Sequence, residues 1–193
     1  QKRYTYDIDK VIFAIGHSSR DTYKMLHSRG VAMENKPFAI GVRIEHLRKD
    51  IDKMQYGEAV SNPLLEAATY NMAFNNKKET RGTFSFCMCP GGEIVNASSE
   101  LGASLVNGMS YSTRSGKFSN SAIVVGISEK DYGDQIFSGM YLQEKLEKKN
   151  YEIVGTYGAI YQNVIDFMKH KKTTFEIESS YKMKLFSYDI NNF

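Results

Sequence analysis

The sequence has no tryptophan, only two cysteines and only three prolines in its 193 residues. Two cysteines cannot supply a disulfide framework, so we expect a reducing, cytoplasmic location. No apolar run approaches the roughly 18 residues that a membrane-spanning helix needs; the longest extends from Val11 to Ile15. These shortages exclude disulfide-rich secreted domains and predict no membrane partner.

An excess of one charge is also missing, because 25 Lys and Arg residues face 22 Asp and Glu residues, for a net charge of +3. So small an excess predicts no nucleic-acid partner. The fifteen glycines never form G-x-G-x-x-G or a P-loop, and neither H-E-x-x-H nor G-x-S-x-G occurs. The chain therefore cannot hold a dinucleotide by the usual fingerprint on its own. Its 41% hydrophobic and 24% charged residues are nevertheless typical of a folded globular protein.

The first 36 residues have the pattern of a β-α unit. Apolar and polar residues alternate from Tyr4 to Ile8, and Val11 to Ile15 is continuously apolar, as in a strand covered on both faces. A helix is predicted from about Arg20 to Arg29, with Ser18 or Ser19 as its N-cap. Residues 1–36 thus resemble part of a separate parallel sheet.

The turn Gly16-His17-Ser18 joins the predicted buried strand to this helix. Ligands of open α/β sheets bind at such turns, and the free N–H groups of a helix N-terminus favour an anion. We therefore predict that Gly16, His17 and Ser18 contact a cofactor. The alternative is that Gly16 only permits a tight turn.

Residues 37–169 predict an α+β domain of two layers, with a mainly antiparallel sheet and helices on one face. Its first strand is marked by the alternation of Phe38, Ile40, Val42 and Ile44 with other residues. The turn Pro90-Gly91-Gly92 predicts a hairpin of the strands on either side. The further strands are expected at 68–75, 84–88, 93–97, 104–107 and 122–127, and the helices at 48–54, 136–150 and 163–169.

Cys87 and Cys89 are candidate catalytic residues, because a spacing of two on a strand places both sulfurs on one face. Thiols with a lowered pKa can carry redox chemistry. The alternative is that both are small buried side chains of a core strand, and a disulfide between them is geometrically poor on an extended strand. No metal site is expected, because the four histidines show no paired spacing.

Arg43, Glu45 and His46 form a second group of candidate catalytic residues at the end of a predicted strand. Arg43 and Glu45 could orient a substrate carboxylate, or they could neutralise each other in a salt bridge. The sequence leaves both possibilities open.

The loop from Gly108 to Ser121 is rich in hydroxyl and cationic side chains. Ser110, Arg114 and Lys117 could donate hydrogen bonds to an anionic cofactor. A plain solvated loop is the alternative.

Several strings occur in an order that is specific for one family. They are Ala14-Ile-Gly-His-Ser18, the segment from Lys36 to His46, Ser85-Phe-Cys-Met-Cys-Pro-Gly-Gly92, Asn107-Gly-Met-Ser-Tyr111 and Asn120-Ser-Ala122. With them, the chain resembles the uncharacterised FAD-dependent dehydrogenases of bacteria, also described as NAD(FAD)-utilizing dehydrogenases. Ile15 replaces a Thr of the flavoprotein Ala-Thr-Gly turn, but the turn itself remains.

The resemblance implies a middle fragment of a longer, FAD-dependent oxidoreductase. Residues 1–36 would belong to its Rossmann-like FAD-binding domain, 37–169 would be the inserted substrate-side domain, and 170–193 would lead back to the FAD-binding domain. FAD is expected in the full-length parent, and neither tight FAD binding nor activity in the fragment alone. The expected partners are the remainder of the FAD-binding domain and an unidentified small-molecule substrate. The alternative is a non-catalytic domain that binds a ligand or a partner.

Overall fold

The computed structural model describes residues 2–75 and 81–193. The chain divides into two compact units, Gln1–Met33 and Glu34–Phe193. This division falls close to the predicted boundary after residue 36, and residues 170–193 lie within the second unit. The functional assignment of these segments stays a prediction.

The N-terminal unit contains the predicted helix but not the predicted strands. Helix α1 (Arg20–Ser28) begins after the N-cap Ser19, and Gly30 follows its end with a φ of +83°. In the described part of 1–19, no residue is in a strand, so the strands predicted at 4–8 and 11–15 are wrong for this chain. An isolated apolar segment has no neighbouring strand to pair its backbone groups, and Ile12 is 92% exposed.

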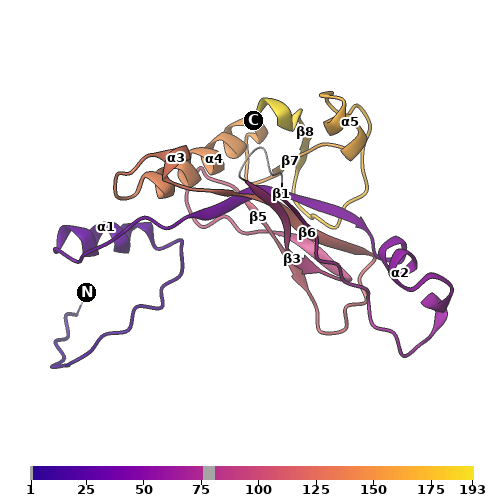
Figure 1. Cartoon of the computed structure of the whole chain (residues 1–193). Coiled ribbons are helices and arrows are strands. Elements are labelled where there is room, and N and C mark those ends of the chain that lie inside the picture. Colours follow the sequence, from indigo (N-terminus) through magenta and orange to yellow (C-terminus); the bar gives the residue numbers. More distant parts are fainter. Residues whose placement is uncertain (1, 76–80) are drawn as a thin grey trace. The chain divides into compact units, whose positions relative to one another are not determined.

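The second unit is built on a four-stranded antiparallel sheet with the order β1-β6-β3-β2 (Figure 1). Strands β1 (Phe38–Leu47) and β6 (Phe118–Ile127) pair along their whole length. Strand β3 (Gly82–Cys89) pairs with β6 on one side and with β2 (Ala73–Asn75) on the other. The predicted α+β fold with a mainly antiparallel sheet is therefore confirmed.

Strand β4 (Gly92–Asn96) pairs with β5 (Val106–Ser110) in a separate antiparallel sheet. The predicted hairpin across the Pro90-Gly91-Gly92 turn is therefore wrong, because the strands on either side of the turn enter different sheets. Gly91 has a φ of +53°, and a Cβ there would come within 1.8 Å of the Arg114 carbonyl oxygen. Glycine thus permits both the left-handed backbone and the close approach of the next loop.

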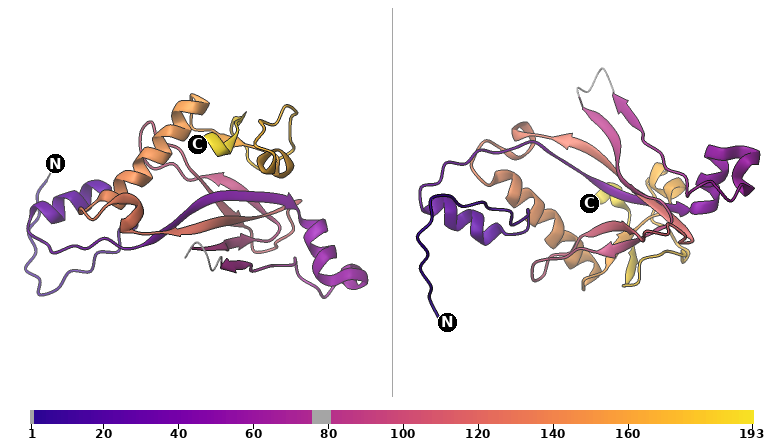
Figure 2. Two further views of the ribbon diagram at one scale, coloured as in Figure 1. Left: turned by 45° about the horizontal axis from the view of Figure 1, so that its top comes forward. Right: turned by 90° about the horizontal axis from the view of Figure 1, so that it is seen from below.

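The long helix α4 (Ser138–Val154) lies on one side of the main sheet, and β7 and β8 follow it (Figure 2). Its buried Asn150 donates to the Ser104 hydroxyl at 2.6 Å and to the Gly158 carbonyl at 3.2 Å. The remaining elements are α2 (Arg48–Tyr56), η1 (Gly57–Ser61), α3 (Glu129–Tyr132), β7 (Ala159–Tyr161), α5 (Val164–Met168), β8 (Leu185–Ser187) and η2 (Ile190–Asn192). Strands β7 and β8 are parallel, so the segment after residue 169 is joined to the second unit.

The apolar core is small, and polar side chains fill part of the interior. Of the alternating residues of β1, Phe38, Ile40 and Ile44 are half-buried, and Val42 is exposed. Ser119, Asn120 and Ser121 of β6 have no exposed surface. A row of fully buried polar residues must find hydrogen bonds within the protein. The partners of this stretch of β6 therefore point to the candidate functional site.

Candidate functional site

The guanidinium of Arg43 lies at the centre of a polar cluster. Its Nε donates to Asn120 Oδ1 at 2.8 Å, and its Nη1 donates to Asn107 Oδ1 at 3.1 Å. Its Nη2 donates to the Cys87 carbonyl oxygen at 2.7 Å and contacts Cys89 Sγ at 3.5 Å. The cluster therefore joins β1, β3, β5 and β6 through one half-buried cation, and we call these five residues the Arg43 cluster.

The sheet register places these residues together. Glu45 is opposite Asn120, and Arg43 is opposite Ala122, so Arg43 and Asn120 project from the same face of neighbouring strands. The backbone of β5 lies close to these two side chains at Gly108. A Cβ at this position would lie 2.3 Å from Arg43 Nη2 and 2.2 Å from Asn120 Oδ1. A side chain at position 108 would thus displace the guanidinium.

No carboxylate lies within ion-pairing distance of Arg43 among the residues that the structure describes. Every acceptor of its hydrogen bonds is neutral, being an amide oxygen, a carbonyl oxygen or a thiol sulfur. The Nδ2 of Asn120 is buried without a hydrogen-bond partner beside this cation. The cluster therefore carries an unneutralised positive charge and an additional buried donor, which together favour an anion.

Glu45 points to a different contact, so the possible salt bridge between Arg43 and Glu45 is absent. Its carboxylate accepts from the Ser180 backbone N–H at 3.2 Å and from the Ser180 hydroxyl. Ser180 is buried and in turn accepts from the Ile94 backbone N–H at 2.8 Å. Glu45 therefore anchors the segment around Ser180 to the sheet, which is a structural role.

His46 lies on the opposite face of β1 and is separate from the Arg43 cluster. Its ring centroid is 5.5 Å from that of Tyr70, and its Nε2 is buried without a partner among the described residues. Burial lowers the pKa of His46, although Glu45 and Asp50 act in the opposite direction. A histidine that resists protonation could serve as a base, but nothing in the described structure presents a substrate group to it.

Cys87 and Cys89 differ in exposure, and both contact Arg43. Cys87 is exposed, whereas Cys89 is buried and 6% exposed. Burial raises the pKa of the Cys89 thiol, and the Arg43 guanidinium opposes this only in part. At neutral pH Cys89 is therefore a thiol and not a ready thiolate nucleophile.

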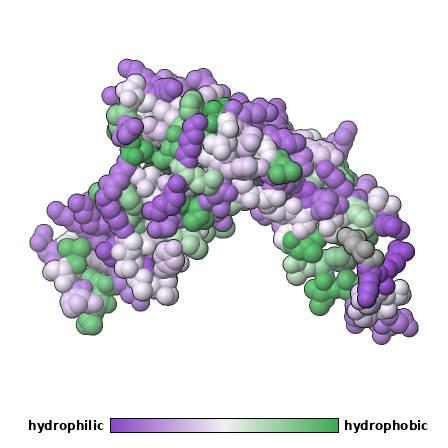
Figure 3. All heavy atoms as spheres, turned by 180° about the vertical axis from the view of Figure 1, so that it is seen from behind, coloured by the Kyte–Doolittle hydropathy of each residue, from purple (hydrophilic) through white to green (hydrophobic). Residues whose placement is uncertain are grey.

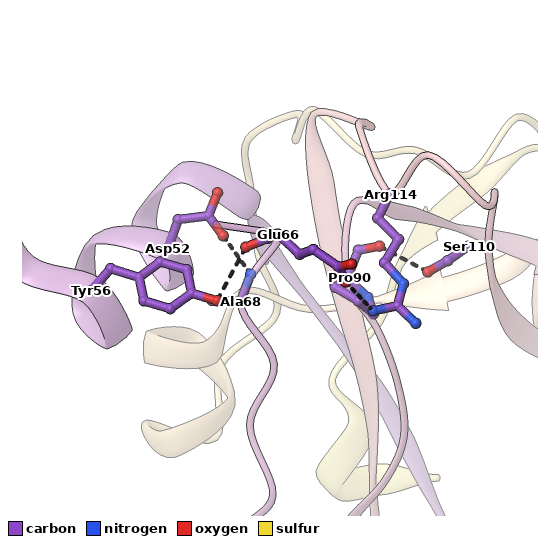
Figure 4. Close-up of polar contacts among 7 residues, drawn as sticks. All are labelled: Asp52, Tyr56, Glu66, Ala68, Pro90, Ser110 and Arg114. Carbon is purple, nitrogen blue, oxygen red and sulfur yellow. Dashed lines mark hydrogen bonds and ion pairs between the residues drawn. The ribbon is translucent and has the colours of Figure 1, made fainter. Parts of the chain in front are cut away.

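The predicted loop is shorter than 108–121, because its ends belong to β5 and β6. Its candidate residues are engaged within the chain, as Figure 4 shows for Arg114 and Ser110. Arg114 Nη1 pairs with Glu66 Oε2 at 3.2 Å, and Ser110 Oγ donates to the Pro90 carbonyl oxygen at 2.8 Å. Lys117 pairs with Glu178. Since both cations already have carboxylate partners, their proposed contact with an anionic cofactor has no support in this geometry.

Figure 4 also shows how the segment that carries Glu66 is held beside α2. Asp52 Oδ1 accepts from the Ala68 backbone N–H at 2.8 Å, and the Tyr56 hydroxyl donates to the Glu66 carbonyl oxygen at 3.1 Å. These contacts hold the segment that carries Glu66, so the ion pair joins this segment to the loop at Arg114.

The turn at Gly16 lies in the N-terminal unit and has the geometry that a glycine provides. Gly16 has a φ of +72°, and a Cβ there would meet no described atom within 4 Å. The Ser19 hydroxyl donates to the Ile15 carbonyl oxygen at 2.7 Å and makes no capping bond, while His17 and Ser18 lie beside it in the turn. Ser19 thus does not cap the helix, but the Thr22 backbone N–H already donates to Asp21 Oδ1 at 2.7 Å, so the turn offers an anion an open backbone at Gly16 and only part of the helix N-terminus.

Sequence reasoning identified Arg43, Cys87 and Cys89 but missed their partners Asn107 and Asn120. Both asparagines stand in strings that supported the family resemblance, Asn107-Gly108 and Asn120-Ser121. Their proximity to Arg43 depends on strands that are distant in sequence, so no local pattern could reveal it.

Other features of the described residues are less informative. Two surface hollows, of about 400 and 210 Å³, contain none of the predicted site residues in their walls. No group of three or more His, Cys, Asp or Glu side chains within 2–75 and 81–193 could hold a metal ion. In the same ranges, every helix is too short or too polar to cross a membrane.

Comparison with known proteins relates most of the chain to one family. A family model described as "FAD-dependent protein, C-terminal domain-like" matches residues 37–193. An uncharacterized protein of Clostridium beijerinckii is 46% identical over 168 residues, which are 86% of this chain and 32% of that protein. The chain thus spans about a third of the length of this curated relative.

Proposed function

Because the chain belongs to the FAD-dependent protein, C-terminal domain-like family, we propose that it forms the substrate-side part of an FAD-dependent oxidoreductase. Within this class, the sequence strings favour the NAD(FAD)-utilizing dehydrogenases. The catalytic unit would be the longer protein, in which bound FAD supplies two-electron redox chemistry. The residues of this chain would bind and orient the substrate and keep water away from it.

The observation that carries this proposal is the unneutralised charge of Arg43. A half-buried cation without a carboxylate partner is unfavourable unless something else compensates its charge. The guanidinium has more N–H groups than its neutral acceptors use, and Asn120 Nδ2 adds a buried donor. A substrate carboxylate would satisfy both, so we propose that Arg43 orients a carboxylate-bearing substrate.

The described residues fit FAD only in part. The Gly16 turn combines an open backbone with a helix N-terminus that Ser19 does not cap, and this suits a close approach by an anionic group. We propose that Gly16, His17 and Ser18 approach the cofactor in the longer protein. No further residues for the phosphates are proposed, because the chain lacks the glycine-rich fingerprint.

A second candidate function is a non-catalytic domain that binds a partner. It is favoured by the exposed apolar residues of the N-terminal unit, where Figure 3 shows apolar side chains at the surface. Val11, Ile12 and Phe13 are each more than half exposed. We propose that the partner is the remainder of the FAD-binding domain, which would cover these residues in the longer protein. This surface is then compatible with the oxidoreductase as well as with a partner-binding domain.

The absorption spectrum of the purified full-length protein tests the cofactor. Bound flavin supports the oxidoreductase, whereas a protein that folds without flavin and does not bind added FAD contradicts it and leaves the partner-binding function.

Carboxylates then test the role of Arg43 in the flavin-loaded protein. Acetate, benzoate and malonate should perturb the flavin spectrum, and their amides should not. Arg43→Gln should abolish this response, and Arg43→Lys should weaken it by at least about tenfold in affinity, because lysine cannot reproduce the planar array of donors. Glu45→Gln is the matched control, because Glu45 binds Ser180 and not Arg43. A bound flavin that ignores carboxylates would contradict only the role of Arg43.

A further inference from the structure

Cys87 and Cys89 lie at a β-bulge and not in a regular strand. Phe86 is opposite Ala122 and Cys89 is opposite Asn120, so three residue steps on β3 match two on β6. The extra residue compresses the backbone between Phe86 and Cys89. A disulfide between residues two apart is geometrically poor on an extended strand, but this segment is not extended.

The backbone conformation and the contacts of this segment agree with a bulge. Cys87 has a φ of +52°, a left-handed conformation that few residues other than glycine adopt. The Cys89 thiol donates back to the Cys87 carbonyl oxygen at 3.3 Å. Arg43 Nη2 donates to the Cys87 carbonyl oxygen and contacts Cys89 Sγ, so one side chain binds both residues of the bulge.

The two cysteines are suited to different steps of thiol–disulfide exchange. Cys87 is exposed and can meet a reagent from solution, whereas Cys89 is buried and can react only with its neighbour. Such an asymmetry is typical of an attacking and a resolving thiol.

We propose that Cys87 and Cys89 form a redox-active pair, which reacts with a low-molecular-weight disulfide and closes into an intramolecular disulfide. The Cys87 thiolate attacks one sulfur of the small disulfide, whose S–S bond breaks, and the first small thiol leaves with a proton. The Cys89 sulfur then attacks the Cys87 sulfur, the Cys87–small-thiol bond breaks, and the second small thiol leaves with the proton that Cys89 gives up. Two electrons pass from the protein to the small disulfide, and the flavin takes no part.

Oxidised glutathione is the probe for full-length protein that has been reduced and freed of reductant. The protein is equilibrated at a series of glutathione ratios, free thiols are trapped with N-ethylmaleimide in denaturant, and trypsin is added. Cleavage after Arg81 and Arg114 releases residues 82–114, a peptide that contains both cysteines and no internal Lys or Arg. Mass spectrometry of this peptide needs no flavin and no substrate.

The folded protein should pass in one transition from the doubly labelled peptide to an unlabelled peptide that lacks two hydrogens. In protein kept unfolded with urea, closure should require a ratio of oxidised to reduced glutathione at least about tenfold higher. Cys89→Ser should accumulate a glutathione adduct on Cys87, and Cys87→Ser should leave Cys89 unmodified in the folded protein. Met88→Leu is the control that should retain closure, because it conserves volume.

Three results would overturn the proposal. The first is a wild-type peptide that stays doubly labelled at every ratio. The second is a peptide that carries two separate glutathione adducts. The third is closure at the same ratio in the folded and unfolded protein, since the bulge would then contribute nothing.

Discussion

Substitution of Gly108 by alanine should disrupt the Arg43 cluster without straining the backbone. The φ of Gly108 is outside the left-handed region, so alanine can adopt the local conformation. Its Cβ, however, would lie 2.2 Å from Asn120 Oδ1, 2.3 Å from Arg43 Nη2 and 2.5 Å from Arg43 Cζ. Asn120 is fully buried, so the half-buried guanidinium of Arg43 has to move.

The cost follows from the hydrogen bonds that this movement breaks. Hydrogen bonds to a charged group contribute about 1.5–3 kcal/mol each to stability. Arg43 makes such bonds to Asn120, Asn107 and the Cys87 carbonyl. Because the guanidinium is half-buried, water can replace part of what is lost. We therefore expect Gly108→Ala to lower the free energy of unfolding by about 2–3 kcal/mol, the equivalent of roughly one of these bonds.

Urea denaturation measures this difference, and tyrosine fluorescence can follow it because the chain has thirteen tyrosines and no tryptophan. Gly126→Ala is the matched control, since Gly126 lies on β6 of the same sheet and a Cβ there would meet no described atom within 4 Å. The control should be neutral or up to about 1 kcal/mol more stable. If the two variants agree within about 0.5 kcal/mol, the packing of Gly108 against Arg43 does not restrain the guanidinium, and the argument fails.

Three further substitutions test other parts of the chain. Gly16→Ala should lower the free energy of unfolding by roughly 1 kcal/mol, because Gly16 has a φ of +72°. If the turn contacts the cofactor, the ratio of flavin absorbance to folded full-length protein should also fall. An unchanged ratio would show that Gly16 only permits a tight turn. Asn150→Ala should lower stability by about 3 kcal/mol, because it leaves the buried partners Ser104 and Gly158 without donors; thermal unfolding measures this, and a loss below about 1 kcal/mol would contradict it. His46 has a pKa below the ordinary 6.5, so the unfolded chain binds the proton more readily and stability should fall as the pH drops below 6.5. His46→Gln should flatten this dependence in urea denaturation across a pH series, and an unchanged slope would show that another group causes it.

The elements that could be predicted from the sequence are those whose pattern is local. The alternation over Phe38 to Ile44 predicted β1, and the apolar run after Ala122 predicted β6, because each strand has one face against other protein. Helix α4 follows from its i, i+4 apolar pairs, although it begins and ends later than predicted, at Ser138 and Val154. Local periodicity sets the type of element well and its ends less well.

The predictions that failed depend on partners that a local pattern does not contain. The run from Val11 to Ile15 has the composition of a buried strand, but a strand needs a neighbour to satisfy its backbone groups. The Pro90-Gly91-Gly92 pattern predicts a hairpin, but the turn directs the chain from one sheet into another. Likewise, Arg43 was recognised as chemically important, while Asn120, which lies 77 residues away in sequence, became its partner only through the pairing of β1 with β6.

The cations of this chain differ in how their charge is compensated, and this difference is the strongest argument about function. Arg114 and Lys117 each pair with an exposed carboxylate, and exposed pairs of this kind contribute little to stability. Arg43 is half-buried, and its acceptors among the described residues are all neutral, although Glu45 projects from the same face of the same strand. That carboxylate is held by Ser180 instead, so the fold keeps the Glu45 carboxylate away from the guanidinium. An arrangement that only stabilised the sheet would gain from pairing the two, and a site that receives an anionic substrate requires that they stay apart.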